Sequence, residues 1–177
     1  MKRLYDLRLA VIALGALALL PVVARATQVS VTNLVSDDQA ANAAQTTDPD
    51  LVNAWGVSYS PTGPFWVSAN GTGVSTLYRV DPATNATTKL GLVVSIPGDG
   101  AVTGEVFNNT PQFNGDPFLF ASEDGTISGW RGALGTTAET LQAASTMNAY
   151  KGTAFANIGG NAYLYAANFA AGTIDVL

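Results

Sequence analysis

The sequence predicts an all-β protein made of repeated units, and a recurring glycine–aromatic motif is the main reason. The motif occurs three times, as Gly56-Val57-Ser58-Tyr59, Gly104-Glu105-Val106-Phe107 and Gly152-Thr153-Ala154-Phe155. Successive glycines are 48 residues apart both times, and a constant period of about 20–50 residues indicates a repeat architecture. Composition agrees, because only 12% of the residues are charged. A surface rich in Ser, Thr, Asn and Gly suits strands and tight turns better than helices.

An aromatic-rich strand is predicted after each copy of the motif. The three strands are Phe65 to Ala69, Phe118 to Ser122 and Tyr163 to Ala167. Side chains alternate between the two faces of a strand, so the first and second residues of each strand point to opposite faces. The expected sets are Phe65, Phe118 and Tyr163 on one face, and Trp66, Leu119 and Leu164 on the other. Because both faces are apolar, we expect neighbouring sheets to cover both.

Turns and further strands complete each unit. Asn70-Gly71 and Asp124-Gly125 predict type I′ hairpins, in which both central residues need a positive φ; the third copy is looser, over Asn168 to Gly172. The third strands are expected at Val74 to Val80, Thr126 to Arg131 and Thr173 to Leu177. Fourth strands are expected at Thr87 to Ile96 and at Glu139 to Thr146, where a short helix is the alternative.

Four antiparallel strands in each unit of about 40–50 residues are typical of a propeller blade. The sequence therefore predicts a partial β-propeller of about two and a half four-stranded blades out of a six-bladed ring, with a β-sandwich as the alternative. The blades are expected at about 51–98, 99–146 and 147–177, after an N-terminal strand (Gln28 to Val35) and loop within residues 27–50. On this interpretation the chain is a fragment that lacks C-terminal blades, and its first and last sheets expose apolar faces.

The first 26 residues read as a helical signal peptide. Basic residues precede an apolar run from Leu9 to Val23, and Ala24-Arg25-Ala26 supplies a small-x-small cleavage pattern. A retained anchor is the alternative, but the run is shorter than the roughly 18–20 residues that span a bilayer. Cleavage would remove four of the eight basic and one of the 13 acidic residues. The remaining net charge of −8 argues against nucleic-acid binding, and we expect an exported protein that is not membrane-bound after cleavage.

The absence of histidine and cysteine limits the chemistry. The chain has neither residue, which excludes histidine-dependent catalytic triads, histidine general bases and thiol chemistry. Serines are plentiful, but none has an obvious activating base. These absences favour a protein that is not an enzyme.

Several stretches resemble an uncharacterised family of exported bacterial β-propeller proteins, some of which carry a PEP-CTERM sorting tail. The stretches that carry the resemblance are Asn53 to Val57, Phe120 to Trp130, Tyr165 to Phe169 and Gly172 to Val176. The resemblance implies a longer propeller, export from a bacterial cell and no assigned activity. The units are also distantly similar to those of NHL and gluconolactonase-like propellers, a similarity of architecture that does not imply function.

Candidate site residues follow from the phase of the repeat. If the glycine motif forms the innermost strand of each unit, the channel mouth holds Asn53, Trp55, Thr103, Glu105 and Lys151. Gluconolactonase-like propellers hold calcium there, which makes Asn53 and Glu105 candidate ligands for this oxygen-seeking ion; a solvated channel wall is the alternative. The acidic clusters Asp37-Asp38, Asp48-Pro49-Asp50 and Glu123-Asp124 are expected to cap turns.

Two functions follow. The first is an exported, non-catalytic binding or scaffold module for a protein, a glycan or a small ligand, with no cofactor. The alternative is a calcium-dependent lactonase or esterase-like hydrolase.

Overall fold

A computed structural model describes residues 29–177. The predicted signal peptide, residues 1–26, lies outside the described residues. The chain divides into two units, residues 1–31 and residues 32–177, and every described strand lies in the second.

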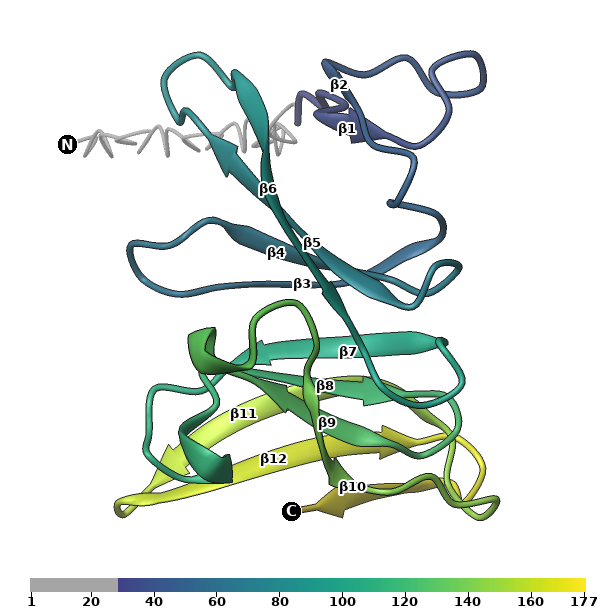
Figure 1. Ribbon diagram of the computed structural model, residues 1–177, viewed down its shortest axis with the longest axis vertical. Coiled ribbons are helices and arrows are strands. Elements are labelled where there is room, and N and C mark those ends of the chain that lie inside the picture. Colours follow the sequence, from purple (N-terminus) through teal and green to yellow (C-terminus); the bar gives the residue numbers. More distant parts are fainter. Residues whose placement is uncertain (1–28) are drawn as a thin grey trace, which may run out of the picture. The chain divides into compact units, whose positions relative to one another are not determined.

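The second unit is all-β and consists mainly of three antiparallel sheets (Figure 1). Sheet 1 contains β3 (Ala54–Tyr59), β4 (Phe65–Ala69), β5 (Val74–Val80) and β6 (Thr87–Ser95). Sheet 2 contains β7 (Val102–Phe107), β8 (Phe118–Ser122), β9 (Ile127–Trp130) and β10 (Glu139–Gln142). Sheet 3 contains β11 (Tyr150–Ile158), β12 (Asn161–Asn168) and β13 (Thr173–Val176). Two short 3-10 helices, η1 (Phe113–Gly115) and η2 (Gly132–Leu134), lie in the connections of sheet 2.

Strands in each sheet are hydrogen-bonded in their order along the chain. The predicted all-β fold with four-stranded antiparallel sheets is therefore confirmed, and β10 is a strand rather than the alternative helix. Within residues 32–177 the sheets do not close into a ring.

The three repeated glycines occupy equivalent places. Each lies in the first strand of its sheet beside a register shift, between Ala54 and Val57 in β3, between Val102 and Gly104 in β7 and between Tyr150 and Thr153 in β11. These first strands also lie side by side, β3 against β7 and β7 against β11. A Cβ atom on Gly56 would be 2.7 Å from the Thr103 carbonyl oxygen, so the glycine allows two backbones to approach closely.

Two apolar clusters fill the spaces between the sheets. Trp66 of β4 stacks on Phe118 of β8, with ring centroids 4.1 Å apart, between sheets 1 and 2. Leu119 of β8 packs with Leu164 of β12 between sheets 2 and 3. All five residues of β8 are buried, which confirms for this strand the prediction that both faces are covered.

The hairpins are where the sequence places them, but their turn type is not the predicted I′. Positive φ falls on the last loop residue, Gly73, Gly125 or Gly172, and not on Asn70 or Asp124. The loops are longer than two residues, since Ala69 pairs with Val74 and Asn168 with Thr173. In such loops a single glycine in the left-handed region ends the turn and restores strand pairing.

The predicted phase of β12 is wrong by one residue. Phe65 and Phe118 pair with the aromatic residues of their glycine motifs, but Phe155 of the third motif pairs with Leu164 rather than Tyr163. Leu164 is fully buried against sheet 2 and Tyr163 is only half-buried. A tyrosine is better placed where its hydroxyl reaches water.

The predicted N-terminal strand from Gln28 to Val35 is also wrong, apart from its last residue. Gln28 lies outside the described residues, and residues 29–34 form no strand. Only β1 (Val35–Ser36) is extended and paired, in parallel, with β2 (Thr46–Thr47). Val29 and Val31 are exposed. The alternating apolar residues there therefore do not form the buried face of a sheet within the described residues.

Candidate functional site

Four of the five predicted site residues lie at or next to the starts of the first strands, at one end of the three sheets: Asn53, Trp55, Thr103 and Lys151. Glu105 is the fourth residue of β7 and lies in mid-strand. The structure brings Trp55 of β3 and Lys151 of β11 together, with the Lys151 ammonium nitrogen 5.4 Å from the centre of the Trp55 ring. The other three predicted residues have different surroundings, described below. Trp55 and Lys151 occupy the same position in their repeats, so the repeat alone identified two residues, one from sheet 1 and one from sheet 3, that lie close together.

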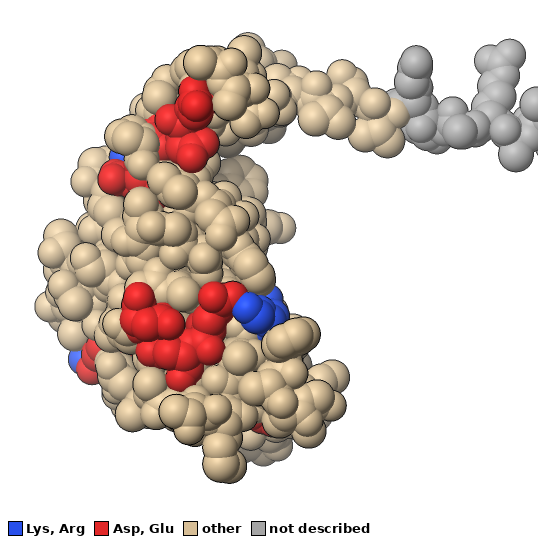
Figure 2. Space-filling model, turned by 90° about the vertical axis from the view of Figure 1, so that its right-hand side faces the viewer, with Lys and Arg blue, Asp and Glu red and all other residues tan. Residues whose placement is uncertain are grey.

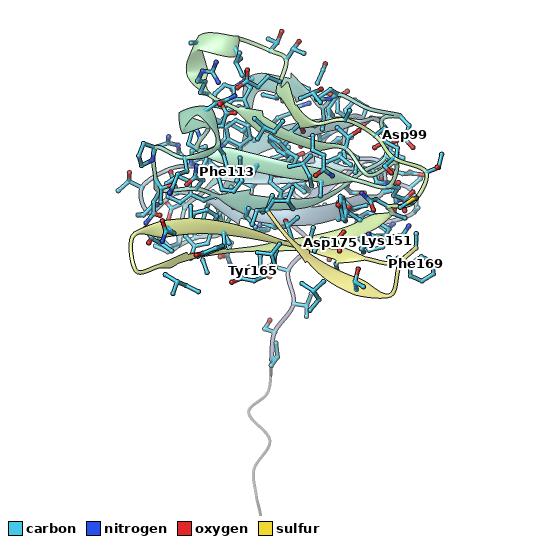
Figure 3. The ribbon with its side chains drawn as sticks, turned by 90° about the horizontal axis from the view of Figure 1, so that it is seen from below. Asp99, Phe113, Lys151, Tyr165, Phe169 and Asp175 are labelled. Carbon is cyan, nitrogen blue, oxygen red and sulfur yellow. The ribbon has the colours of Figure 1, made fainter. Side chains whose placement is uncertain are left out.

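Lys151 is the centre of a cluster that also contains two residues not predicted as ligands. Its ammonium nitrogen lies 5.8 Å from the centre of the Phe169 ring, from the β12–β13 loop, and forms an ion pair with Glu123 from the β8–β9 loop. We call Trp55, Glu123, Lys151 and Phe169 the Lys151 cluster. Phe169 is 77% exposed and Trp55 is 41% exposed, so both rings keep surface available to a ligand. Figure 3 shows Lys151 and Phe169 as neighbours at this end of the sheets.

A hollow of about 510 Å³ borders the Lys151 cluster. Its wall is formed by the β8–β9 loop, the segment before β11 and the β12–β13 loop, through Glu123, Asp124, Ala144, Ser145, Thr146, Asn148, Ala149 and Ala170. Known ligand pockets have volumes of about 300–1,000 Å³. The hollow is therefore large enough for a small polar molecule.

Hydrogen bonds between loops hold the wall of this hollow. The backbone N–H of Ser145 donates to the Asp124 carbonyl oxygen at 2.9 Å, and the Asn168 amide donates to the Asn148 side-chain oxygen at 2.9 Å. The same Asn168 amide donates to Asp175 of β13 at 2.8 Å. The polar groups of the hollow are thus positioned before any ligand arrives.

This end of the sheets is mainly acidic. Figure 2 shows acidic side chains gathered on it beside one basic patch. Asp124 accepts backbone hydrogen bonds from Thr126 and Asp99, both at 2.9 Å, which confirms its predicted turn role. Glu123 differs, because its carboxylate pairs with Lys151 instead of capping the turn. An anionic ligand would meet carboxylates and a lysine already paired with Glu123, so the electrostatics disfavour an anionic ligand.

Thr103 is buried and serves the framework. Its hydroxyl lies 2.8 Å from the Tyr150 carbonyl oxygen and 3.1 Å from the Ala121 carbonyl oxygen. It therefore ties β7 to β8 and to β11, and it offers no surface to a ligand.

Glu105 is buried between sheets 1 and 2. Ser68 Oγ donates to Glu105 Oε2 at 2.8 Å, and Ser75 Oγ lies 3.0 Å from the same oxygen. Burial raises the pKa of this carboxyl to about 8, although the two serine hydrogen bonds act to lower it. At neutral pH the carboxyl is mostly protonated, which is unfavourable for a calcium ligand.

The structure does not bring Asn53 and Glu105 into one hollow. Asn53 has a positive φ of 53° and donates its side-chain amide to the Asn70 side-chain oxygen at 3.0 Å. It borders a hollow near β1, whereas Glu105 borders another that Thr153 and Phe155 also line. Across residues 29–177, no three Asp or Glu side chains are arranged to hold a metal ion.

The other acidic clusters are structural. Asp38 accepts the backbone N–H of Ala40 at 2.8 Å, and Asp48 accepts that of Asp50 at 3.0 Å, as predicted for turn-capping residues. Asp48 also forms an ion pair with Lys89 of β6, a contact that holds the N-terminal loop against sheet 1.

The arrangement at the Lys151 cluster is suited to binding a ligand. Two exposed rings offer apolar faces, and the lysine–glutamate pair offers hydrogen-bond donors and acceptors.

None of the helices in the described part of the chain has the length and apolar character that crossing a membrane requires. A comparison with models of protein families found no match, and a search of curated proteins found none either.

Proposed function

We propose that this protein is an exported, non-catalytic β-propeller module that binds a short saccharide at the hollow beside the Lys151 cluster. The propeller is supported by the side-by-side first strands and by the repeated antiparallel meander of each sheet (Figure 1). Export is supported by the leader pattern of residues 1–26. The observation that carries the binding proposal is the pair of exposed rings, Trp55 and Phe169, whose centres lie 5.4 and 5.8 Å from one lysine nitrogen.

A saccharide fits this surface for two physical reasons. A sugar ring has one apolar face, which can pack on an aromatic ring, and a rim of hydroxyls that need hydrogen-bond partners. The hollow supplies those partners through Glu123, Ser145 and Asn148. Because the lysine is already paired with Glu123, an uncharged sugar can bind without separating this ion pair.

A glycan panel screened with the exported protein, followed by calorimetric titration of the best ligand, tests this function. Phe169→Ala and Trp55→Ala should each weaken binding by about 5-fold, since an aromatic stacking contact contributes on the order of 1 kcal/mol. Tyr59→Ala is the matched control, because Tyr59 is an exposed aromatic residue at the other end of β3. The proposal fails if no saccharide binds, or if the control weakens binding as much as the cluster variants do.

A further inference from the structure

The two interfaces between sheets follow one rule. In each interface, side chains from the second strand of the earlier sheet pack on side chains from the second strand of the later sheet. The two sets occupy alternate positions of the repeat, so each sheet uses one face toward the sheet before it and the other face toward the sheet after it. Trp66 of sheet 1 meets Phe118 and Phe120 of sheet 2. Leu119 of sheet 2 in turn meets Leu164 and Ala166 of sheet 3.

Strand register makes these positions equivalent from sheet to sheet. Phe65, Phe118 and Leu164 each pair with the aromatic residue of their own glycine motif. We call the face that carries these residues the receiving face of its sheet. The opposite face, which carries Trp66 in sheet 1 and Leu119 in sheet 2, is the presenting face.

Within residues 32–177, one face of each kind is not packed against another of the three main sheets. The receiving face of sheet 1 carries Val57, Tyr59 and Phe65, and all three are exposed, Val57 by 61%. The presenting face of sheet 3 carries Ile174 and Val176, which are both exposed, Ile174 by 70%. The outer face of sheet 3 is therefore apolar and uncovered, as expected. The N-terminal segment covers part of the outer face of sheet 1, where the buried Tyr78 donates its hydroxyl to Asp48.

The receiving face of sheet 1 is also hollowed. A groove of about 480 Å³ lies between this face and the N-terminal segment. Leu51, Val57, Phe65, Val67 and Val80 line it, and residues 32–35 form its other wall. Tyr165 lies on the presenting face of sheet 3, paired with Val176, and it projects a large ring there (Figure 3). The described structure thus contains one hollowed apolar face and one projecting apolar face.

We propose that a second copy of this chain docks head to tail, with the presenting face of sheet 3 on the receiving face of sheet 1. The internal interfaces carry this inference, because both of them pair a presenting face with a receiving face. Docking would continue the same stacking between molecules that already exists within one molecule. Two different patches meet in such a contact, so repeated docking builds a ring or an open filament rather than a two-fold dimer.

Two charge-introducing variants, Val57→Lys and Ile174→Lys, separate this arrangement from its alternatives. Each changes an exposed residue on one face only, so the fold should persist, which circular dichroism checks. The exported protein should associate in sedimentation velocity across a dilution series, and each variant alone should be monomeric. An equal mixture of the two variants should form one-to-one dimers, because each supplies the face that the other lacks.

Met147→Lys is the control, since Met147 is 75% exposed in the loop before β11 and lies on neither face; it should associate as the parent protein does. A monomeric parent protein overturns the proposal. A variant that still dimerises alone also overturns it, because that result indicates contact between like faces.

The absence of cysteine offers a second readout. Val57→Cys and Ile174→Cys, mixed under mild oxidation, should give the mixed disulfide at least 10-fold in excess of either homodimer. Equal amounts of all three products would contradict the head-to-tail arrangement.

Discussion

Replacing Glu105 by glutamine should remove a large part of the pH dependence of stability. Glu105 is buried between sheets 1 and 2, where Ser68 and Ser75 are its hydrogen-bond partners. Burial raises the pKa of its carboxyl from the ordinary value of 4.5 to about 8. Glutamine retains the shape and the hydrogen-bonding capacity, because serine hydroxyls can rotate to donate or accept.

The sign of the effect follows from the direction of the pKa change. A carboxyl whose pKa is higher in the folded state contributes stability that is fully present below pH 4.5 and is lost as the pH rises through about 8. Each tenfold difference in proton affinity corresponds to about 1.4 kcal/mol. The parent protein should therefore lose up to about 5 kcal/mol of unfolding free energy between these limits, and about 3 kcal/mol of it by pH 7.

Urea unfolding of the parent protein and of Glu105→Gln at a series of pH values between 4 and 9 measures this difference. The two proteins should be similar near pH 4, and the glutamine variant should be more stable at pH 8 and above. Glu105→Leu is the matched control, because it also removes the titrating group but leaves two buried serine hydroxyls without their partner. It should be less stable than the glutamine variant by about 1–3 kcal/mol at every pH, and its stability should be as independent of pH as that of the glutamine variant. Parallel profiles for the parent and glutamine proteins would refute the reasoning.

Three further predictions concern stability. Gly56→Ala should destabilise the protein by about 2–3 kcal/mol, because its Cβ would lie 2.7 Å from a β7 carbonyl oxygen. Gly152→Ala has no atom within 4 Å of its Cβ and should cost under about 1 kcal/mol in urea unfolding; equal costs would contradict the close-approach explanation. Leu119→Ala should lower the unfolding free energy by about 2–5 kcal/mol, whereas Ile174→Ala, at an exposed site, should change it by less than about 1 kcal/mol in the monomer. Asp48→Asn should cost about 1–3 kcal/mol at neutral pH, since Lys89 is partly exposed and keeps its ion pair with Asp50. Burial opposes but does not outweigh the lysine and tyrosine hydrogen bonds that lower the Asp48 pKa, so this advantage of the parent protein should be present above pH 3.8 and shrink in titrated melting curves as the pH falls below it.

The strands were predictable because their signals are local. Period-two alternation and nearby turn residues locate β4, β5, β8 and β9 to within one residue. The turn type was not predictable in the same way, because loop length decides whether Asn70 or Gly73 takes the positive φ. The prediction that Tyr163 rather than Leu164 pairs with the motif aromatic failed for a similar reason. The pairing register of β11 with β12 decides which of the two side chains faces sheet 2.

The candidate site was predictable only in part. Trp55 and Lys151 share a phase in the repeat, and residues in phase meet when first strands lie side by side. Glu123 and Phe169 come from loops at other phases, so no spacing in the sequence links them to Lys151. Glu105 follows the repeated glycine of β7, as predicted. That its carboxyl is buried against Ser68 and Ser75 became visible only once sheet 1 was seen packed on sheet 2.

The amino-acid sequence alone determines that this protein is made of repeated antiparallel sheets, because alternation, turn residues and the 48-residue period act over short stretches of chain. Tertiary structure alone decides which side chains surround Lys151, which carboxyl is buried and which apolar faces remain open. Those properties depend on contacts between residues far apart in the chain, and such contacts form only when one sheet packs on the next.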